Sequence, residues 1–398
     1  GERYGWRLVF HHHDWWFDNR WQRWPELKRA GLGTLADAAR WILSPAAGMR
    51  HAAINGEDAA PLVRAFGTRA RWLPNPVEEL PPCAASEVRQ ARRWLRERVG
   101  AVGPVWILPC RLLRRKNVAE ALLLTRWLRP EACLVTTGGV SSADEEAYAR
   151  ALTDRARKES WALELGVLAR EGARGPEVRA LMAASEAVML TSLVEGFGLP
   201  YLEACAARRP LVARALRNVS PDLDRMGFTF PYSYGEILVS PALFDWRRER
   251  RRQEARHARW RAGLPVAVRR MAGVPWLVAT GAVPAAVPMS RLTLRAQLEV
   301  LGCSVDESWA ACAPLNPCLV AWRELASRGR LRPGTWPSTA SEFLGTKAYG
   351  ERFEGLLKAR GGGRRPVSQD AVVRAQRELL QRKVESANLY PLLWSCQP

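Results

Sequence analysis

The apolar run Ala187-Val-Met-Leu190 is followed by the loop Thr191-Ser-Leu-Val-Glu195-Gly-Phe-Gly198 and by Leu199-Pro-Tyr-Leu-Glu203-Ala204. Four consecutive apolar residues are typical of a strand that is buried on both faces. Two glycines let the loop backbone approach a ligand closely, and a proline is tolerated near the start of a helix. The stretch predicts a strand, a ligand-binding loop and a helix from about residue 199, with Glu203 in its first turn.

The same alternation of strand and helix repeats on both sides of this stretch. Further strands are predicted at 105–110, 133–137, 162–165 and 210–213, and helices at roughly 117–128, 143–158 and 176–184. Such alternation implies a parallel sheet with right-handed crossovers, and ligands bind beyond the carboxyl ends of its strands. The predicted fold class is therefore α/β, with a Rossmann-type parallel sheet.

Three zones differ in pattern. Residues 1–98 are rich in tryptophan and histidine and contain the cluster Pro74-Asn-Pro76, which interrupts regular structure. Residues 99–245 carry the strand–helix units, and residues 246–398 are rich in arginine with mostly helical patterns. We predict an N-terminal α/β domain at 1–98, a Rossmann-like domain at 99–245 and a helical C-terminal extension at 246–398.

Charged residues follow two of the predicted strands. Arg111 and Lys116 come after the strand at 105–110, and Glu195 comes after the strand at 187–190. Because parallel strands end at one edge of a sheet, these residues are expected to share a crevice. An arginine fork and a lysine suit a diphosphate, and the amides at the next helix start favour a phosphate. Glu195 can accept hydrogen bonds from sugar hydroxyls, and Glu203 from a ribose.

The segment Ser192-Leu-Val-Glu-Gly-Phe-Gly-Leu-Pro-Tyr-Leu-Glu-Ala204 resembles the Glu-x7-Glu signature of family 4 retaining glycosyltransferases, which have the GT-B fold. Arg111 and Lys116, five residues apart, resemble that family's Arg and Lys after the first strand of its donor domain. Leu73-Pro-Asn-Pro-Val77, His51-Ala-Ala-Ile-Asn55 and Asp58 are similar to the end of its acceptor domain. No glycine-rich loop precedes them, so the resemblance predicts an N-terminal domain that is incomplete.

The resemblance implies a role for each matched position. Arg111 and Lys116 would neutralise the departing diphosphate, Glu195 would orient the transferred sugar and Glu203 would hold the ribose. The loop would supply backbone contacts to the sugar and phosphate from Gly196, Phe197, Gly198 and Leu199. It further implies transfer with retention, a nucleotide-sugar as co-substrate, an unassigned acceptor, and neither a metal nor another cofactor. The alternative is a non-catalytic remnant that binds a nucleotide or a glycan.

A histidine cluster follows the predicted strand at 7–10. His11, His12, His13 and Asp14 are consecutive, and three interpretations stay open: a metal site, a structural role, or a place in the active cleft. For the cleft, His13 is the favoured catalytic candidate, because Asp14 can orient its imidazole. The nearby aromatic residues serve either sugar stacking or packing; they are Trp15, Trp16, Trp21 and Trp24.

The formal net charge is +20, from 60 basic and 40 acidic residues. Two explanations of this positive excess stay open: an anionic partner, or a coding bias toward arginine. We expect no nucleic-acid partner, because the chain lacks a recognisable nucleic-acid-binding motif. The basic run Arg247–Arg261 predicts a solvated helical face, with a surface for anionic lipid or a phosphorylated acceptor as the alternative.

Eight cysteines are scattered without a CxxC pair, so buried free thiols in a reducing compartment are expected. The uncharged stretch Met271–Ser290 is broken by prolines and glycines, which predicts loop and short buried segments rather than a membrane span. The predicted location is cytoplasmic, with a membrane-peripheral one as the alternative.

Overall fold

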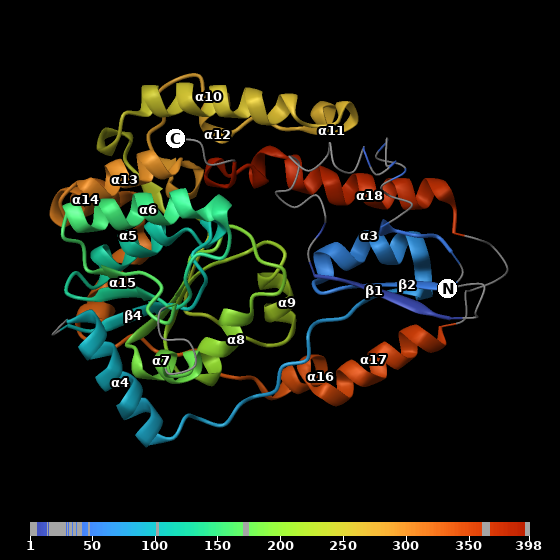
Figure 1. Ribbon diagram of the computed structural model, residues 1–398, viewed down its shortest axis with the longest axis horizontal. Coiled ribbons are helices and arrows are strands. Elements are labelled where there is room, and N and C mark those ends of the chain that lie inside the picture. Colours follow the sequence, from blue (N-terminus) through green and yellow to red (C-terminus); the bar gives the residue numbers. More distant parts are fainter. Residues whose placement is uncertain are drawn as a thin grey trace.

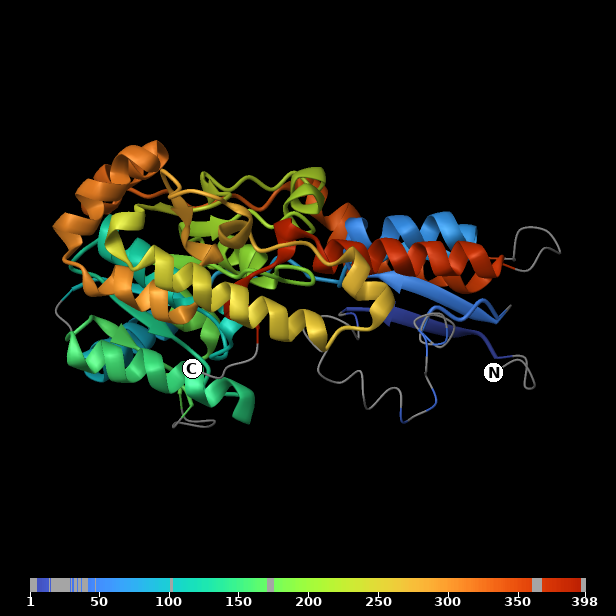
Figure 2. The ribbon, with the colours of Figure 1, turned by 90° about the horizontal axis from the view of Figure 1, so that it is seen from above.

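The computed structural model describes residues 6–13, 15, 29, 31, 34, 37, 42–46, 48–100, 103–169, 175–359 and 367–394. Two α/β units lie end to end, one around a six-stranded sheet and one around a three-stranded sheet (Figures 1 and 2). Both sheets are parallel. The predicted α/β fold with a Rossmann-type parallel sheet is confirmed.

The larger sheet has the strand order β6-β5-β4-β7-β8-β9. Its strands are β4 (Val105–Leu108), β5 (Cys133–Thr136), β6 (Leu163–Glu164), β7 (Ala187–Leu190), β8 (Leu211–Arg214) and β9 (Tyr232–Tyr234). The chain leaves β4 toward β5 and β6, and later returns to place β7 on the other side of β4. The order of the strands therefore reverses between β4 and β7.

Both faces of this sheet are covered by helices, because side chains alternate along each strand. Trp106 and Leu108 of β4 belong to one core and Ile107 to the other, and all three are fully buried. The first core contains α5 (Val118–Leu128) and α6 (Ala143–Lys158), and the second contains α4 (Ala85–Val99), α7 (Val178–Ala184), α8 (Leu199–Ala206) and α9 (Ser220–Arg225). The strands of this sheet are uninterrupted apolar runs because both faces of the sheet are buried under helices.

The smaller sheet has the order β1-β2-β3. Its strands are β1 (Leu8–His12), β2 (Met49–Ala53) and β3 (Ala70–Trp72). Ala53 packs in a cluster with α3 (Gly56–Phe66) and α18 (Gln369–Val384), and its neighbour Ala52 packs with Leu356 of α17 (Thr346–Lys358). Figure 1 shows this sheet between α3 and α18 on one side and α17 on the other.

The segment after residue 245 is mostly helical, as predicted, and its helices are divided between the two units. Helices α13 (Leu294–Gly302), α14 (Val305–Cys312) and α15 (Pro317–Ser327) pack on α5, whereas α18 packs on α3. The remaining elements are α10 (Trp246–Ala262), α11 (Val266–Met271), α12 (Trp276–Ala279), α16 (Ser341–Leu344), and an antiparallel pair of β10 (Leu238–Val239) and β11 (Val287–Pro288). Helix α18, near the C-terminal end of the described residues, thus packs against α3 of the smaller unit.

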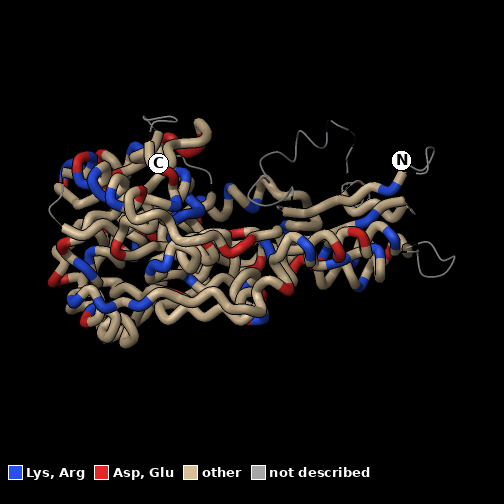
Figure 3. Tube along the Cα trace, turned by 90° about the horizontal axis from the view of Figure 1, so that it is seen from below, with Lys and Arg blue, Asp and Glu red and all other residues tan. Residues whose placement is uncertain are grey.

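Basic and acidic residues are interspersed along both units (Figure 3). The described cysteines are free, and Cys318 is exposed, so the expectation that the thiols are all buried is wrong at that position. Cys396 lies outside the described residues. Within the described part of the chain, no helix combines the length and the apolar character that a bilayer crossing requires.

Candidate functional site

A cavity of about 540 Å³ lies at the carboxyl ends of β4, β5 and β7. It occupies the place where the strand order reverses, which is the usual ligand site of an open parallel sheet. We call it the strand-end cavity. Most of the predicted site residues line it, namely Arg111, Lys116, Glu195, Phe197, Gly198, Leu199 and Glu203.

The loops after β4 and β5 are joined at the cavity wall. The Gly138 amide donates a hydrogen bond to the Cys110 carbonyl at 2.8 Å, and the Leu112 amide donates to the Gly139 carbonyl at 3.0 Å. A Cβ at Gly138 would lie 3.2 Å from the Arg111 Cα. Gly138 lines the cavity although it was not among the predicted site residues; its position after a strand was the only signal.

The carboxylate of Glu195 accepts hydrogen bonds from three side chains. The Lys116 ammonium donates a hydrogen bond to its carboxylate, Arg115 Nη1 lies 2.6 Å from Oε2, and the Ser192 hydroxyl donates at 2.6 Å. The side chains of Lys116 and Glu195 are each 9% exposed. Thr191 Oγ1 donates to the Lys116 carbonyl at 2.9 Å, which ties the end of β7 to the turn that carries the lysine.

Arg115 is a residue that the sequence analysis missed. Its neighbours Arg114 and Lys116 belong to the same basic run, and nothing in the local pattern distinguishes the three. In the structure Arg114 pairs with Glu145, whereas Arg115 and Lys116 pair with Glu195. The pairing partner, and not the sequence position, therefore separates their roles.

The ion pairs control the ionisation of Glu195. Burial alone would raise its pKa, but the charges of Lys116 and Arg115 outweigh this effect, and the pKa lies below its ordinary value. Glu195 is therefore a carboxylate at neutral pH. Its negative charge compensates one of the two adjacent cations, which leaves the cluster with one net positive charge.

Arg111 and Glu203 face the cavity without protein partners. Among the described residues, no carboxylate pairs with Arg111, and no donor forms a hydrogen bond with the Glu203 carboxylate. Burial raises the pKa of Glu203, and Lys116 partly offsets this rise. Both side chains therefore have hydrogen-bonding capacity that a ligand can use.

Glu203 lies farther along its helix than predicted. Helix α8 begins at Leu199, so Glu203 is its fifth residue and lies outside the first turn. The helix begins at the predicted residue, but the prediction that Glu203 occupies the first turn is wrong, because a turn of 3.6 residues is completed at Leu202. The carboxylate still reaches the cavity, since it lies one turn beyond Leu199 and both residues line it.

Gly198 is required by the geometry of the loop. Its φ is +80°, a left-handed conformation that side chains rarely adopt. A Cβ at this position would lie 2.6 Å from Val219 Cγ1 and 3.0 Å from the Tyr201 ring. The glycine therefore allows the loop to turn into α8 against a packed wall.

Two asparagine side chains hold the loop from outside the cavity. Asn218 Nδ2 donates to the Glu195 carbonyl at 2.6 Å, and Asn55 Nδ2 donates to the Gly196 carbonyl at 3.2 Å. Gly196 itself is not among the residues that line the strand-end cavity, so its contact with the donor stays a prediction. Asn55 precedes α3 of the smaller unit, so its hydrogen bond to Gly196 connects both units.

His13 does not line the strand-end cavity. Its Nε2 lies 3.3 Å from His11 Nδ1, and His11 Nε2 lies 2.8 Å from the Leu73 carbonyl. Asp14, its predicted orienting partner, lies outside the described residues. The role of His13 in catalysis therefore stays a prediction, and the structure places it within the histidine cluster at the end of β1.

His12 of this cluster and His51 of β2 are packed. His12 stacks on Trp15 at 4.5 Å between ring centroids, and its Nε2 lies 3.2 Å from His51 Nδ1. Burial lowers the pKa of His12 to about 3 and that of His51 to about 4. These rings are neutral at physiological pH. Trp15 is used in packing, while Trp16, Trp21 and Trp24 lie outside the described residues.

Metal-type ligands do not gather anywhere in the described residues: no three His, Cys, Asp or Glu side chains are placed so that they could hold an ion. The expectation of a site without a metal remains a prediction.

Residues 103–229 match the family model described as "Glycosyl transferases group 1". The matched segment spans β4 to α9 and contains Arg111, Lys116, Glu195 and Glu203. The predicted glycosyltransferase domain is confirmed over these residues. No curated protein matches the chain.

Solved structures with related architecture include HepE from Anabaena in complex with UDP and glucose, at 19% identity over 54% of this chain and 54% of that chain, with a TM-score of 0.39. A UDP-forming α,α-trehalose-phosphate synthase from Burkholderia xenovorans is 13% identical over 90% of this chain and 70% of its own, with a TM-score of 0.46. WaaG, a glycosyltransferase involved in lipopolysaccharide biosynthesis, is 14% identical over 89% and 75%, with a TM-score of 0.40. The chain spans about half the length of HepE.

Proposed function

We propose that this chain, whose residues 103–229 form a glycosyl transferase group 1 domain, transfers a sugar from a nucleoside diphosphate donor with retention of configuration. The observation that carries the proposal is that Arg111, Lys116, Glu195 and Glu203 line one cavity at the switch point of a parallel sheet. They come from two loops and a helix that are far apart in the sequence. A cavity with cations and carboxylates on its walls suits a ligand that has both phosphates and hydroxyls.

The cations act on the leaving group. When the bond between the anomeric carbon and the diphosphate breaks, negative charge builds on the phosphate oxygens. Arg111 lines the cavity without an ion pair to any described carboxylate, and the cluster of Arg115, Lys116 and Glu195 has one net positive charge. Together they match a doubly charged diphosphate without further ions. Fixed charges that are already in place stabilise this developing charge, which is often the largest part of catalysis.

The carboxylates act on the hydroxyl groups. Glu203 accepts no hydrogen bond from the described residues, and in the complex it accepts hydrogen bonds from the ribose. Glu195 is held by Lys116, Arg115 and Ser192, so it presents a fixed acceptor edge to the sugar. The Asn218 contact with the Glu195 carbonyl fixes the backbone in the same way. Such preorganisation positions the anomeric carbon, because the protein groups need not move during the reaction.

Donor binding tests the proposal. Calorimetry with UDP-, GDP- and ADP-sugars is compared for the wild type, Lys116→Ala and the control Lys347→Ala, whose lysine is exposed on α17. We expect one donor to bind the wild type and the control equally, and Lys116→Ala to weaken it at least about tenfold. If no donor binds, or if both variants bind like the wild type, the proposal is wrong.

Turnover separates an enzyme from a binding remnant. Release of nucleoside diphosphate from the bound donor, in the presence and absence of EDTA, is the readout. Release that persists with EDTA supports transfer without a metal, whereas donor binding without any release favours the non-catalytic alternative. The cytoplasmic location and a contact with an anionic membrane remain predictions from the sequence.

A further inference from the structure

The turn that carries Lys116 ends in a residue with a left-handed backbone. Asn117 has a φ of +49° and a ψ of +54°, and it is fully buried. Among the described residues, only Ser160 and Arg208 also combine a side chain with a positive φ, and neither lines the strand-end cavity. Asparagine is one of the few side chains that tolerate this conformation. Such backbone persists where the surrounding structure holds it, and it is concentrated at functional sites.

Both ends of the Asn117 carboxamide are engaged. Its Nδ2 donates a hydrogen bond to Glu120 Oε2 at 2.9 Å, and its Oδ1 accepts one from Gln297 Nε2 at 3.1 Å. Its backbone amide donates to the Arg114 carbonyl at 3.0 Å. Because a buried polar group without a partner is costly, these hydrogen bonds favour one orientation of the turn.

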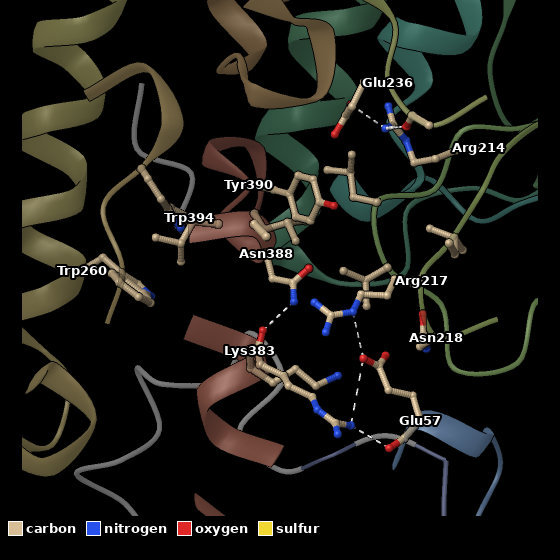
Figure 4. A pocket seen from close by; sticks show the side chains of 18 of the residues that line it. Glu57, Arg214, Arg217, Asn218, Glu236, Trp260, Lys383, Asn388, Tyr390 and Trp394 are labelled. Atoms are coloured by element: carbon tan, nitrogen blue, oxygen red, sulfur yellow. Dashed lines mark hydrogen bonds and ion pairs between the residues drawn. The ribbon is translucent and has the colours of Figure 1, made fainter. Parts of the chain in front are cut away.

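Glu120 is a fixed anchor for Asn117. Its carboxylate pairs with the guanidinium of Arg214, whose Nη2 lies 2.6 Å from Oε2, and it accepts a hydrogen bond from the Tyr234 hydroxyl at 2.7 Å. These three side chains are buried. Arg214 Nη1 also lies 2.6 Å from Glu236, and both residues line a second cavity of about 420 Å³ (Figure 4). Since a buried ion pair is costly to break, the carboxylate of Glu120 stays in place.

Gln297 brings the C-terminal part of the chain to the same turn. It is fully buried in α13, which packs on α5 (Figure 1). Its Nε2 donates to Asn117 Oδ1 and also to the Met289 carbonyl at 3.0 Å, so both N–H groups are used. Gln297 lies outside residues 103–229, which match the glycosyl transferase group 1 model. A segment that the family model does not cover therefore contacts the turn of the lysine.

Lys116 depends on its backbone because its side chain is flexible. The four-carbon stem of lysine rotates freely, so the position of the backbone decides which atoms the ammonium can reach. The ammonium of Lys116 contacts the Glu195 carboxylate and lines the strand-end cavity. The Lys116 carbonyl accepts from Thr191 Oγ1 at 2.9 Å, and the next residue is held by its carboxamide. A displacement of about 1 Å would move the charge away from the group that it has to stabilise.

We propose that Asn117 and Gln297 are positioning residues for Lys116, so that the C-terminal segment contributes to sugar transfer by holding the turn of this lysine. The inference rests on the proposed function, because the positioned charge is the one that neutralises the departing diphosphate. Neither Asn117 nor Gln297 lines the strand-end cavity, so neither contacts the donor. Their effect on donor binding and turnover therefore acts through Lys116.

Gln297→Met tests this inference, because methionine keeps the length of the side chain and removes its hydrogen-bond donors. Gln253→Met is the matched control. Gln253 is also a fully buried glutamine of the C-terminal segment, and its Nε2 donates to Glu249 at 2.8 Å and to the Arg291 carbonyl at 2.7 Å. Each variant loses a pair of buried hydrogen bonds, so urea unfolding is expected to show similar losses of stability. Only Gln297→Met alters the turn of Lys116.

A double-variant cycle separates positioning from a purely structural role. Calorimetry measures the affinity for whichever UDP-, GDP- or ADP-sugar the wild type binds, and release of nucleoside diphosphate measures turnover. We expect Gln297→Met to lower both about tenfold, and Gln253→Met to change them less than about twofold. In the Lys116→Ala background, Gln297→Met is expected to have no further effect, because the charge that it positions is already absent.

Acetylation reports the position of Lys116 without any donor. Acetic anhydride modifies lysine amino groups, and peptide mass spectrometry compares Lys116 with the exposed Lys347 in the same sample. The side chain of Lys116 is 9% exposed and paired with Glu195, so it is expected to react slowly in the wild type. We expect Gln297→Met to raise its relative rate about fivefold and Gln253→Met to leave it unchanged.

Asn117→Gly is a second variant that keeps the left-handed backbone and removes the carboxamide. It is expected to lower donor affinity and to raise Lys116 acetylation as Gln297→Met does, and it replaces that variant if methionine prevents folding. Equal effects of Gln297→Met and Gln253→Met would overturn the inference, as would an undiminished effect in the Lys116→Ala background. The proposed function fails separately, when the wild type binds no nucleotide-sugar; the acetylation of Lys116 still tests the positioning in that case.

Discussion

The ammonium group of Lys116 donates a hydrogen bond to the carboxylate of Glu195, although Lys116 follows β4 and Glu195 follows β7, 79 residues later in the chain. This contact joins the loop after the first strand of the larger sheet to the loop after its fourth. It is buried and shared with Arg115. A single carboxylate thus holds together the cationic and the glycine-rich parts of the site.

Removal of the Glu195 charge is predicted to cost both stability and activity. In Glu195→Gln, the buried ammonium of Lys116 loses its counter-charge, and we expect the free energy of unfolding to fall by about 3 kcal/mol. Urea unfolding measures this. The control Glu254→Gln removes an exposed carboxylate that pairs with Arg250 and is expected to cost no more than about 0.5 kcal/mol. Equal losses would show that the buried cluster has no special energetic role.

Gly198→Ala is predicted to distort the loop. The left-handed φ and the close approach to Val219 Cγ1 both oppose a Cβ, so we expect a loss of about 1–3 kcal/mol and weaker donor binding. The double variant Gly198→Ala/Val219→Ala relieves the clash but not the backbone strain, so it should recover only part of the donor affinity. Gly350→Ala, inside α17 with open space around it, is expected to raise stability by about 0.5–1 kcal/mol. Thermal unfolding and calorimetry measure both quantities.

Acid is predicted to destabilise the smaller unit through its buried histidines. The folded pKa values of about 3 for His12 and about 4 for His51 lie below the unfolded value of 6.5. The unfolded chain therefore binds more protons below pH 6.5, and stability falls as the pH decreases from there toward the folded pKa values. Each histidine contributes up to about 1.4 kcal/mol per pH unit in this window.

Unfolding of wild type and His12→Gln at pH 7.5 and pH 5 tests this effect. The variant is expected to lose less stability between the two pH values than the wild type, even if it is less stable at pH 7.5. The control His13→Gln changes a histidine of the same cluster that is not packed against Trp15. A wild-type stability that does not change with pH would contradict the prediction.

Glu203 is predicted to make donor binding sensitive to acid. Burial raises its pKa, so the carboxylate becomes protonated at a higher pH than an ordinary glutamate and loses acceptor capacity. We expect donor affinity to fall on acidification in the wild type, and Glu203→Gln to bind about tenfold more weakly at neutral pH with a flatter pH dependence. Calorimetry across the pH range measures this. Glu164→Gln, on the exposed edge strand β6, is the matched control and should follow the wild type.

Local patterns predicted five of the six strands of the larger sheet, all but β9, and most of the residues that line the strand-end cavity. The apolar run at 187–190, the glycines at 196 and 198 and the basic residues after 110 are neighbours in the chain, and their chemistry depends on adjacent residues. The error at Glu203 is also local, because the predicted start at residue 199 is correct and Glu203, the fifth helical residue, lies just beyond the first turn.

Contacts between distant segments could not be predicted in this way. Nothing in the basic run distinguishes Arg115 from Arg114, because the difference lies in which carboxylate each one meets after folding. The cavity lined by Arg259 of α10 and by Tyr390 likewise forms only when α10 and residues 382–394 come together beside β8 and β9. The periodicity of apolar residues shows which face of each strand or helix is buried. It does not show which distant segments pack together, and that packing decides which side chains face one another across a cavity.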